Sequence, residues 1–216
     1  MAWNVMVDLE TLGNGNDAVI VAIGAVAWET GRFPDETWPL DVVDRRKFYE
    51  RVTPESGVAV GMKIDASTVL WWLTQDDAAR AEVVLAGTNG MAIHRALGAF
   101  QEWFLRFGVD WTTLLWGNGA SFDNVILATA YAKTGVPRPW TFRQDRCYRT
   151  AVAMLDPEGK RKPADNNRKH SALADALWQA EYLDKLLVHS TVNNYEDDDE
   201  AQARSARSTD GYGGDL

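Results

Sequence analysis

The chain has 216 residues, of which 46% are hydrophobic and 10 are tryptophans. This composition can build one ordinary domain with a sizeable core and excludes a globally disordered protein. No apolar run approaches the ~20 residues that cross a membrane, and the first residues lack the pattern of a leader peptide, so we expect neither. The single cysteine, Cys147, excludes an intrachain disulfide and suits a cytoplasmic location.

The formal net charge of −9 is distributed unevenly. Residues 190–216 hold seven acidic residues and two arginines, a net −5, so residues 1–189 carry only −4. Within these, residues 138–169 hold nine Lys or Arg against four Asp or Glu. Because acid and base lie in different segments, phosphate binding by the basic segment remains open, beside the alternative of a charged, solvated loop.

The chain opens on an apolar run, residues 5–11, that carries Asp8 and Glu10. We predict a strand over residues 3–9 and a loop over the glycine- and asparagine-rich residues 12–17. Side chains two positions apart on a strand point to the same face. A solvent-facing strand also carries such charges, whereas on a central strand two like charges are costly unless a cation lies between them. Alone, this run fits either interpretation.

The remaining elements follow in an order typical of an α/β fold with a mixed β-sheet flanked by helices. Residues 18–28 predict a second strand antiparallel to the first, and residues 47–53 a third, so that the three form a meander. Beyond them helices alternate with short strands. We expect helices over 65–72, 90–107, 121–133, 147–155 and 170–188, strands over 112–116 and 142–146, and a polar, basic loop over 156–168.

From residue 190 the composition changes to residues that cannot bury a core. We therefore predict a domain over residues 1–189 and a flexible acidic tail over residues 190–216. The acidic run 196–200 could also chelate cations, but its composition favours a solvated coil.

Two later clusters carry further acidic residues. Asp123 falls in the first turn of the helix after strand 112–116, where the helix dipole favours an acid and where open α/β sheets also build their sites. Asp175 lies among alanines and leucines without a basic residue three or four positions away, so it needs a tertiary partner or a metal. On one helix His170 and Asp175 would lie about 140° apart, so they flank one site only if His170 precedes the helix.

In this order the clusters resemble the motifs of the DEDDh exonuclease superfamily, which contains RNase T, oligoribonuclease and the DnaQ-type proofreading exonucleases. The motifs lie within residues 5–180 and are Asp8-x-Glu10, Asp123 after a Ser-Phe turn, and His170-x4-Asp175. Three further segments are similar to phage DexA-type exonucleases and mycobacterial-type 3′–5′ exoribonucleases. These segments are Ser67-Thr68-x-x-Trp71-Trp72, Trp116-Gly117-x-Gly119-x-Ser121-Phe122-Asp123 and Asp145-x3-Arg149-Thr150.

The resemblance implies an RNase H-like fold and a metal-dependent 3′–5′ exonuclease. Such an enzyme would release nucleoside 5′-monophosphates from single-stranded ends or overhangs, with RNA slightly favoured over DNA. By the resemblance, His170 would be the general base and two Mg²⁺ or Mn²⁺ ions would be held by Asp8, Glu10, Asp123 and Asp175. Carboxylates are the hard oxygen ligands these ions take, and two ions about 3.5–4 Å apart suit phosphodiester hydrolysis.

The resemblance also suggests substrate contacts. Leu12 and Phe122 would pack against terminal bases, and Arg149 would contact a phosphate. Trp71 and Trp72 would offer stacking platforms for unpaired bases, although the pair fits a core position as well. We expect structural or solvent-exposed roles for His94 and His189, and a buried, inert thiol at Cys147.

Other functions fit parts of the pattern. They are a catalytically inactive nucleic-acid-binding module, a hydrolase of short oligonucleotides, and a structural subunit recruited through the acidic tail. Four acids and a histidine argue against a module that only binds, because carboxylates clustered near phosphate are unfavourable without cations. Members of the superfamily include dimers, and ten tryptophans would allow an apolar homodimer interface.

Overall fold

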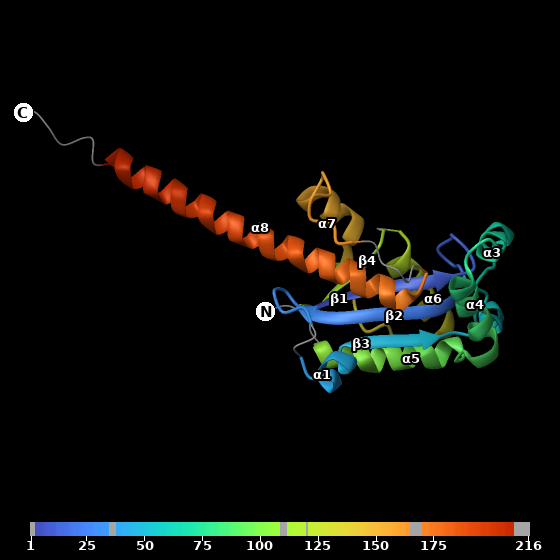
Figure 1. Ribbon diagram of the computed structural model, residues 1–216. Coiled ribbons are helices and arrows are strands. Elements are labelled where there is room, and N and C mark those ends of the chain that lie inside the picture. The colour runs from blue at the N-terminus through green and yellow to red at the C-terminus, as the bar shows by residue number, and fades with distance from the viewer. Residues whose placement is uncertain (1–2, 35–37, 109–111, 120, 165–169, 210–216) are drawn as a thin grey trace, which may run out of the picture.

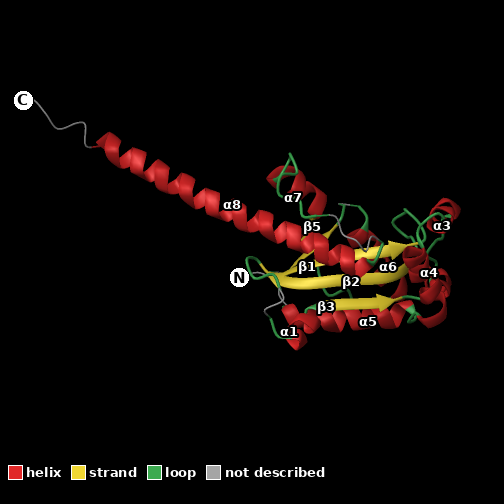
Figure 2. Cartoon of the chain, in the orientation of Figure 1, coloured by secondary structure: helices red, strands yellow, loops and turns green. Residues whose placement is uncertain are grey.

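The computed structural model describes residues 3–34, 38–108, 112–119, 121–164 and 170–209, with residues 192–209 described for the backbone only. Its centre is a five-stranded mixed sheet in the order β3-β2-β1-β4-β5, with helices on both faces (Figures 1 and 2). The strands are β1 (Trp3–Thr11), β2 (Ile20–Glu29), β3 (Lys47–Arg51), β4 (Leu114–Gly117) and β5 (Asp145–Cys147). The predicted α/β fold is confirmed.

β1 lies in the middle of the sheet. It pairs antiparallel with β2 and parallel with β4, while β3 and β5 form the edges. The predicted meander of the first three strands is therefore confirmed. The strand predicted over 142–146 begins later, because Phe142–Gln144 forms a 3-10 turn, η2, that is closed by a capping box between Thr141 and Gln144.

Eight α-helices and two 3-10 turns are found in the described part of the chain. They are α1 (Leu40–Arg45), α2 (Pro54–Ala59), α3 (Ala66–Leu73), α4 (Asp77–Asn89), α5 (Ile93–Phe104), η1 (Leu105–Phe107), α6 (Asp123–Thr134), η2, α7 (Tyr148–Leu155) and α8 (Ala172–Thr209). Five of these helices match predicted ones, whereas α1, α2 and α4 were not predicted from the sequence. The first two are too short to show a helical period, and α4 buries only Ala79 and Ala86.

The last helix differs from the expectation at its far end. α8 continues to Thr209, and Figure 1 shows its second half extending away from the sheet. The solvated coil expected for residues 196–200 is therefore wrong for their backbone, which is helical; Ala, Glu, Gln and Arg in this segment are good helix formers that need no core. The flexible tail over residues 190–216 stays a prediction. The domain boundary at residue 189 stays a prediction. No helix in the described ranges has an apolar stretch long enough to cross a bilayer.

The two faces of β1 enter different parts of the core. Val5, Val7 and Leu9 belong to a large cluster with α5 and α6, whereas Met6 joins a second cluster with Val26, Trp28 and α8. Because side chains alternate along a strand, Asp8 and Glu10 share the face of Met6. The two carboxylates therefore point toward the layer formed by α8.

A glycine on β2 lets the first turn of α8 reach the sheet. Gly24 is the cross-strand partner of Asp8. A Cβ atom on Gly24 would lie 2.1 Å from the carbonyl carbon of Ala172 and 2.2 Å from the nitrogen of Leu173. The backbone of α8 thus packs directly on the backbone of β2, beside Asp8, at a distance that no side chain would allow.

We expect Gly24→Ala to destabilise the fold, because the added methyl group must push the start of α8 away from the sheet. Overpacking of this kind costs about 1–3 kcal/mol. Gly98→Ala is the matched control: Gly98 lies inside α5 with nothing within 4 Å of an added Cβ, so it should gain roughly 0.5–1 kcal/mol from helix propensity. Urea unfolding of both variants measures the difference. Equal stability of Gly24→Ala and wild type would contradict the close contact.

Candidate metal centre

Three carboxylates gather where the end of β1 meets the first turn of α8. Asp8 and Glu10 come from β1, and Asp175 comes from α8. Each offers an oxygen, and these oxygens all lie within 4.8 Å of one another. Glu10 is buried, and the other two are half-buried. Residues far apart in the sequence are therefore brought to one point, as the sequence analysis expected for these three.

Asp123 lies beside this trio, on the side of β4. It begins α6, and its carboxylate accepts hydrogen bonds from the backbone N–H groups of Leu9, at 3.1 Å, and Asn118, at 2.8 Å. The first bond ties it to β1 between Asp8 and Glu10. Burial raises the pKa of Asp123 to about 6, against the opposing effect of these backbone N–H groups. Asp123 is also the strongest charged neighbour acting on Asp8.

Burial and like charge make the cluster unfavourable when all its members are ionised. Burial, followed by repulsion from Asp123, Glu10 and Asp175, raises the pKa of Asp8 well above its ordinary value. Burial, followed by repulsion from Asp175, raises the pKa of Glu10 from 4.5 to about 8. A divalent cation would remove this repulsion, and carboxylate oxygens are ligands that Mg²⁺ and Mn²⁺ prefer. The donor set therefore fits a divalent cation.

His170 lies in the turn before α8, the arrangement that the sequence analysis required for it to flank one site with Asp175. Its backbone has a φ of 66°, and its N–H donates to Oδ2 of Asp175 at 3.0 Å. Its ring packs edge-on against Trp71, with centroids 5.0 Å apart, and lies 6.0 Å from Trp72. The imidazole thus packs against the tryptophan pair of α3, while the backbone of the same residue bonds to a carboxylate of the cluster.

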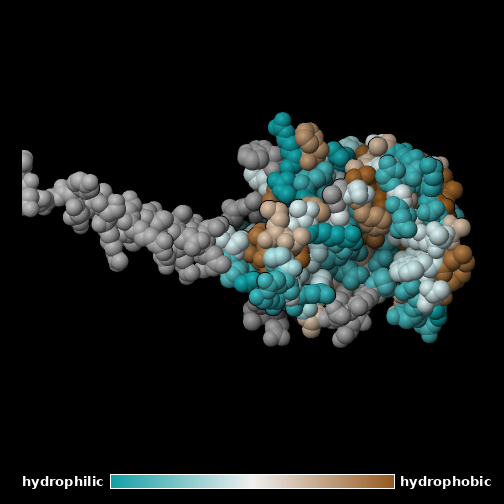
Figure 3. Space-filling view, turned by 90° about the horizontal axis from the view of Figure 1, so that it is seen from above, coloured by the Kyte–Doolittle hydropathy of each residue, from teal (hydrophilic) through white to brown (hydrophobic). Residues whose placement is uncertain are grey.

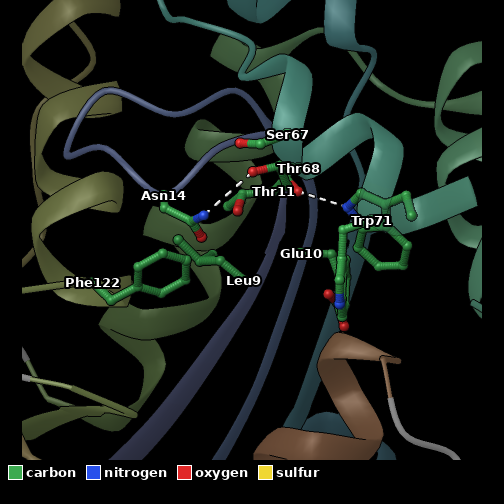
Figure 4. Close-up of a pocket in the computed structure, with 9 residues that line it drawn as sticks. Leu9, Glu10, Thr11, Asn14, Ser67, Thr68, Trp71 and Phe122 are labelled. Atoms are coloured by element: carbon green, nitrogen blue, oxygen red, sulfur yellow. Dashed lines mark hydrogen bonds between the residues drawn. The ribbon is translucent and has the colours of Figure 1, made fainter. Parts of the chain in front are cut away.

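A pocket of about 380 Å³ adjoins Glu10. Figure 4 shows Phe122 and Leu9 on one side of it and Trp71 on the other, with Glu10 between them. Trp71 is 43% exposed, whereas Trp72 is buried and donates from its ring to the carbonyl of Thr11 at 2.9 Å. The remaining lining residues are Thr11, Asn14, Ser67, Thr68 and Trp72.

The other predicted contacts divide between the pocket and the rest of the molecule. Phe122 lines the pocket, but Leu12 is buried in the core and is not among the lining residues, where Leu9 stands instead. Arg149 of α7 is exposed and donates to the side chain of Asn118 at 3.0 Å. Its positive charge lowers the pKa of Asp123, so the guanidinium lies on that side of the cluster.

Two polar groups that were not predicted from the sequence act on the carboxylates. Gln179 of α8 donates from Nε2 to Oδ1 of Asp8 at 2.8 Å. Its only signal was its position four residues after Asp175, which puts both on one face of the helix. Glu82 of α4 raises the pKa of Glu10 and is itself paired with Arg51, at 3.1 Å. It has no sequence signal, because α4 was not predicted.

Comparison with known proteins is consistent with this geometry. A profile of the 3′-5′ exoribonuclease Rv2179c-like domain family matches residues 3–187. An exodeoxyribonuclease of Enterobacteria phage T4 is 25% identical over 126 residues, which cover 58% of this chain and 54% of that protein. The chain therefore spans about half the length of this curated relative.

Solved structures of nucleases share the fold. Escherichia coli exonuclease I in complex with a dT13 oligonucleotide superposes with a TM-score of 0.61 at 12% identity, covering 90% of this chain and 43% of that one. Cell-death related nuclease 4 gives a TM-score of 0.58 at 14% identity, covering 88% and 64%. The five-stranded sheet and its helices are thus arranged as in these RNase H-like nucleases.

The raised pKa values predict how the metal-free protein responds to pH. Between about 4.5 and about 8 folded Glu10 binds a proton that the unfolded chain has lost, so stability should fall as pH rises, by about 1.4 kcal/mol per pH unit for each such proton. Asp8 and Asp123 act in the same direction. Thermal unfolding in chelator across this range should show a falling Tm, and Mn²⁺ should reverse most of the fall at the alkaline end.

The control is Glu10→Gln, which removes one of the buried ionisable groups. Its Tm in chelator should fall less steeply with pH than that of wild type, and Mn²⁺ should raise it less. A Tm that rises over this range in wild type, or that Mn²⁺ leaves unchanged, would contradict the electrostatic account.

Proposed function

This chain belongs to the 3′-5′ exoribonuclease Rv2179c-like domain family, and from that premise we propose that it is a metal-dependent 3′–5′ exonuclease. It would hydrolyse phosphodiester bonds at single-stranded ends or overhangs and release nucleoside 5′-monophosphates. The observation that carries the proposal is the convergence of Asp8, Glu10 and Asp175, whose oxygens lie within 4.8 Å of one another. Three carboxylates beside an open pocket can bind cations that in turn bind an anionic substrate.

In this proposal Asp8, Glu10, Asp123 and Asp175 hold two Mg²⁺ or Mn²⁺ ions. When bound, the ions would stabilise the charge that develops on the phosphate and its attacking and leaving oxygens. His170 takes the proton of the attacking water at its imidazole, since histidine is the side chain that most often acts as a general base. Its position supports this role, because its backbone N–H bonds to Asp175 and its ring packs against Trp71, which lines the pocket beside Glu10.

The pocket beside Glu10 takes the terminal nucleotide. Its volume of about 380 Å³ is small for a ligand site, which favours one nucleotide over a longer stretch. Phe122 and Trp71 face it from opposite sides, so an unpaired base can enter between aromatic rings (Figure 4). α3 also exposes Leu70 and Leu73, and Figure 3 shows brown, hydrophobic atoms at the end of the body where α3 lies. An unpaired end therefore suits this site better than a duplex.

RNA is slightly favoured over DNA in the proposal, because the matching family is named for an exoribonuclease. The phage T4 relative is named an exodeoxyribonuclease, so both sugars belong in the test. Arg149, exposed on α7 on the Asp123 side of the cluster, contacts a substrate phosphate in this arrangement. A guanidinium is the usual partner for a phosphate oxygen.

Digestion of RNA and DNA strands of matched sequence, labelled at either end, tests the activity directly. With Mg²⁺ or Mn²⁺ a 5′-labelled strand should shorten one nucleotide at a time, and a 3′-labelled strand should release labelled mononucleotide at once. Chelator should abolish both reactions. Asp175→Asn should lower kcat at least about 100-fold, since metal-assisted charge stabilisation is worth several kcal/mol.

Asp184→Asn is the matched control, because Asp184 is another buried carboxylate of α8. It accepts hydrogen bonds from Trp28 and Gly31, so its loss should affect stability and leave the cleavage pattern intact. Binding without cleavage in wild type would instead favour a catalytically inactive binding module. Cleavage restricted to strands of a few nucleotides would favour a short-oligonucleotide hydrolase.

The stacking role of Trp71 predicts a separate effect on substrate binding. Trp71→Ala should weaken binding of a single strand about 5- to 150-fold, because stacking is worth roughly 1–3 kcal/mol per base. Trp71→Phe should lose less. Trp38, which packs over Arg46 beside α1 at the other end of the sheet, provides the control as Trp38→Ala. Fluorescence anisotropy with a labelled strand in Ca²⁺ measures the affinities. Equal weakening by both alanine variants would contradict a stacking role for Trp71.

A further inference from the structure

Gln179 is a buried amide whose side chain ends on one of the clustered carboxylates. It lies one turn after Asp175 on α8, so both residues face the sheet from the same side of the helix. Its Nε2 donates to Oδ1 of Asp8 at 2.8 Å, and only 4% of the residue is exposed. One turn of helix thus supplies a carboxylate to the cluster and a hydrogen-bond donor to the carboxylate on β1.

The direction of this amide follows from its chemistry. An ionised carboxylate, the form that binds a cation, can only accept hydrogen bonds, so in that form of the site the NH₂ group faces Asp8 and the oxygen faces away, as in the structure. Oε1 of Gln179 is buried and has no hydrogen-bond partner among the described residues. An unpaired buried acceptor costs free energy, so an apolar side chain of similar size would serve the core at least as well. The favourable contribution of this glutamine is therefore its bond to Asp8.

The bond has two consequences for a cation site. It fixes the orientation of the Asp8 carboxylate while using only part of its acceptor capacity, which leaves Oδ2 free to act as a ligand. It also links α8 to β1 directly at the cluster, so that Asp175 and Asp8 keep their mutual position. Groups that orient metal ligands in this way commonly set the affinity of a site for its ion.

We infer that Gln179 is a positioning residue for the metal centre, acting through Asp8. The inference rests on the proposed function, because it assumes that the carboxylates hold divalent cations. It assigns Gln179 no contact with substrate. Its loss should therefore weaken cation binding and leave the stability of the metal-free fold largely unchanged.

Direct measurement of Mn²⁺ binding by electron paramagnetic resonance tests this. Gln179→Met should weaken Mn²⁺ binding about 10- to 100-fold, the usual effect of losing such a partner. Its Tm in chelator should stay close to that of wild type. Hydrolysis at limiting Mn²⁺ should fall and should recover toward the wild-type rate as Mn²⁺ is raised to saturation, because the ligands themselves are intact.

Gln144→Met is the matched control, since Gln144 is also 4% exposed and lies in η2, where it bonds to Thr113 and Thr141. It should lower the Tm and leave the Mn²⁺ affinity at the wild-type value. Gln179→Leu serves as a second variant should the methionine variant fail to fold. Wild-type Mn²⁺ affinity in a folded Gln179 variant, or equal losses in the Gln179 and Gln144 variants, would overturn the inference.

The outcomes also separate this inference from the proposed function. If wild type binds Mn²⁺ and Gln179→Met binds it more weakly, while neither cleaves nucleic acid, the positioning role stands and the exonuclease proposal fails. If wild type cleaves and Gln179→Met retains full Mn²⁺ affinity, the exonuclease proposal stands and the positioning role fails. Absence of Mn²⁺ binding by wild type would overturn both.

Discussion

Repulsion between buried carboxylates is the constraint on which the arrangement of this protein depends. Asp8 and Glu10 stand on a central strand, half-buried and buried respectively, where an ionised acid loses part of its hydration. The protein compensates in part: backbone N–H groups of Leu9 and Asn118 bond to Asp123, and Gln179 bonds to Asp8. These bonds orient the acids but do not neutralise them. Burial and mutual repulsion raise the pKa values of Asp8 and Glu10, so a bound proton or a cation would relieve the remaining charge.

The fold brings the acids together through backbone contacts as much as through side chains. The second core cluster joins Met6, Val26 and Trp28 to the apolar face of α8 and holds that helix along the sheet. Gly24 then lets the first turn of the helix touch β2. Hydrophobic packing holds α8 against the sheet, and the lack of a side chain on Gly24 allows the short distance between the backbones of α8 and β2. Asp175 lies close to Asp8 because α8 packs on the second core cluster and also touches β2 at Gly24, the partner of Asp8. The site therefore depends on this part of the core.

The sequence predicts the features of the site that depend on local spacing, and it does not predict those that depend on tertiary contacts. The period-two spacing of Asp8 and Glu10 placed them on one face of a strand, and the structure agrees. The last helix was predicted from residue 170 but begins at Ala172, so His170 lies in the turn before it, which is the condition that the angular argument set for sharing a site with Asp175. Gly24 carried no such signal, because a glycine in a strand does not reveal what approaches it. A glutamine in an amphipathic helix equally fits a solvated face, so Gln179 could not be distinguished without tertiary contacts. Leu12 was predicted to contact the substrate, but Leu9 lines the pocket instead and Leu12 lies in the core. The sequence could not show this, because the elements that pack against the loop after β1 were unknown.

The tryptophan pair of α3 joins the pocket to the carboxylate cluster, and this explains why two adjacent aromatic residues have different surroundings. Trp72 is buried and anchors α3 to β1 through the carbonyl of Thr11. Trp71, one residue earlier, remains 43% exposed and forms the pocket wall. Both rings contact His170, whose own backbone is tied to Asp175. A group that enters the pocket against Trp71 therefore presses on the same ring that supports the imidazole. In the proposed function, binding of a base and placement of His170 would therefore both depend on Trp71.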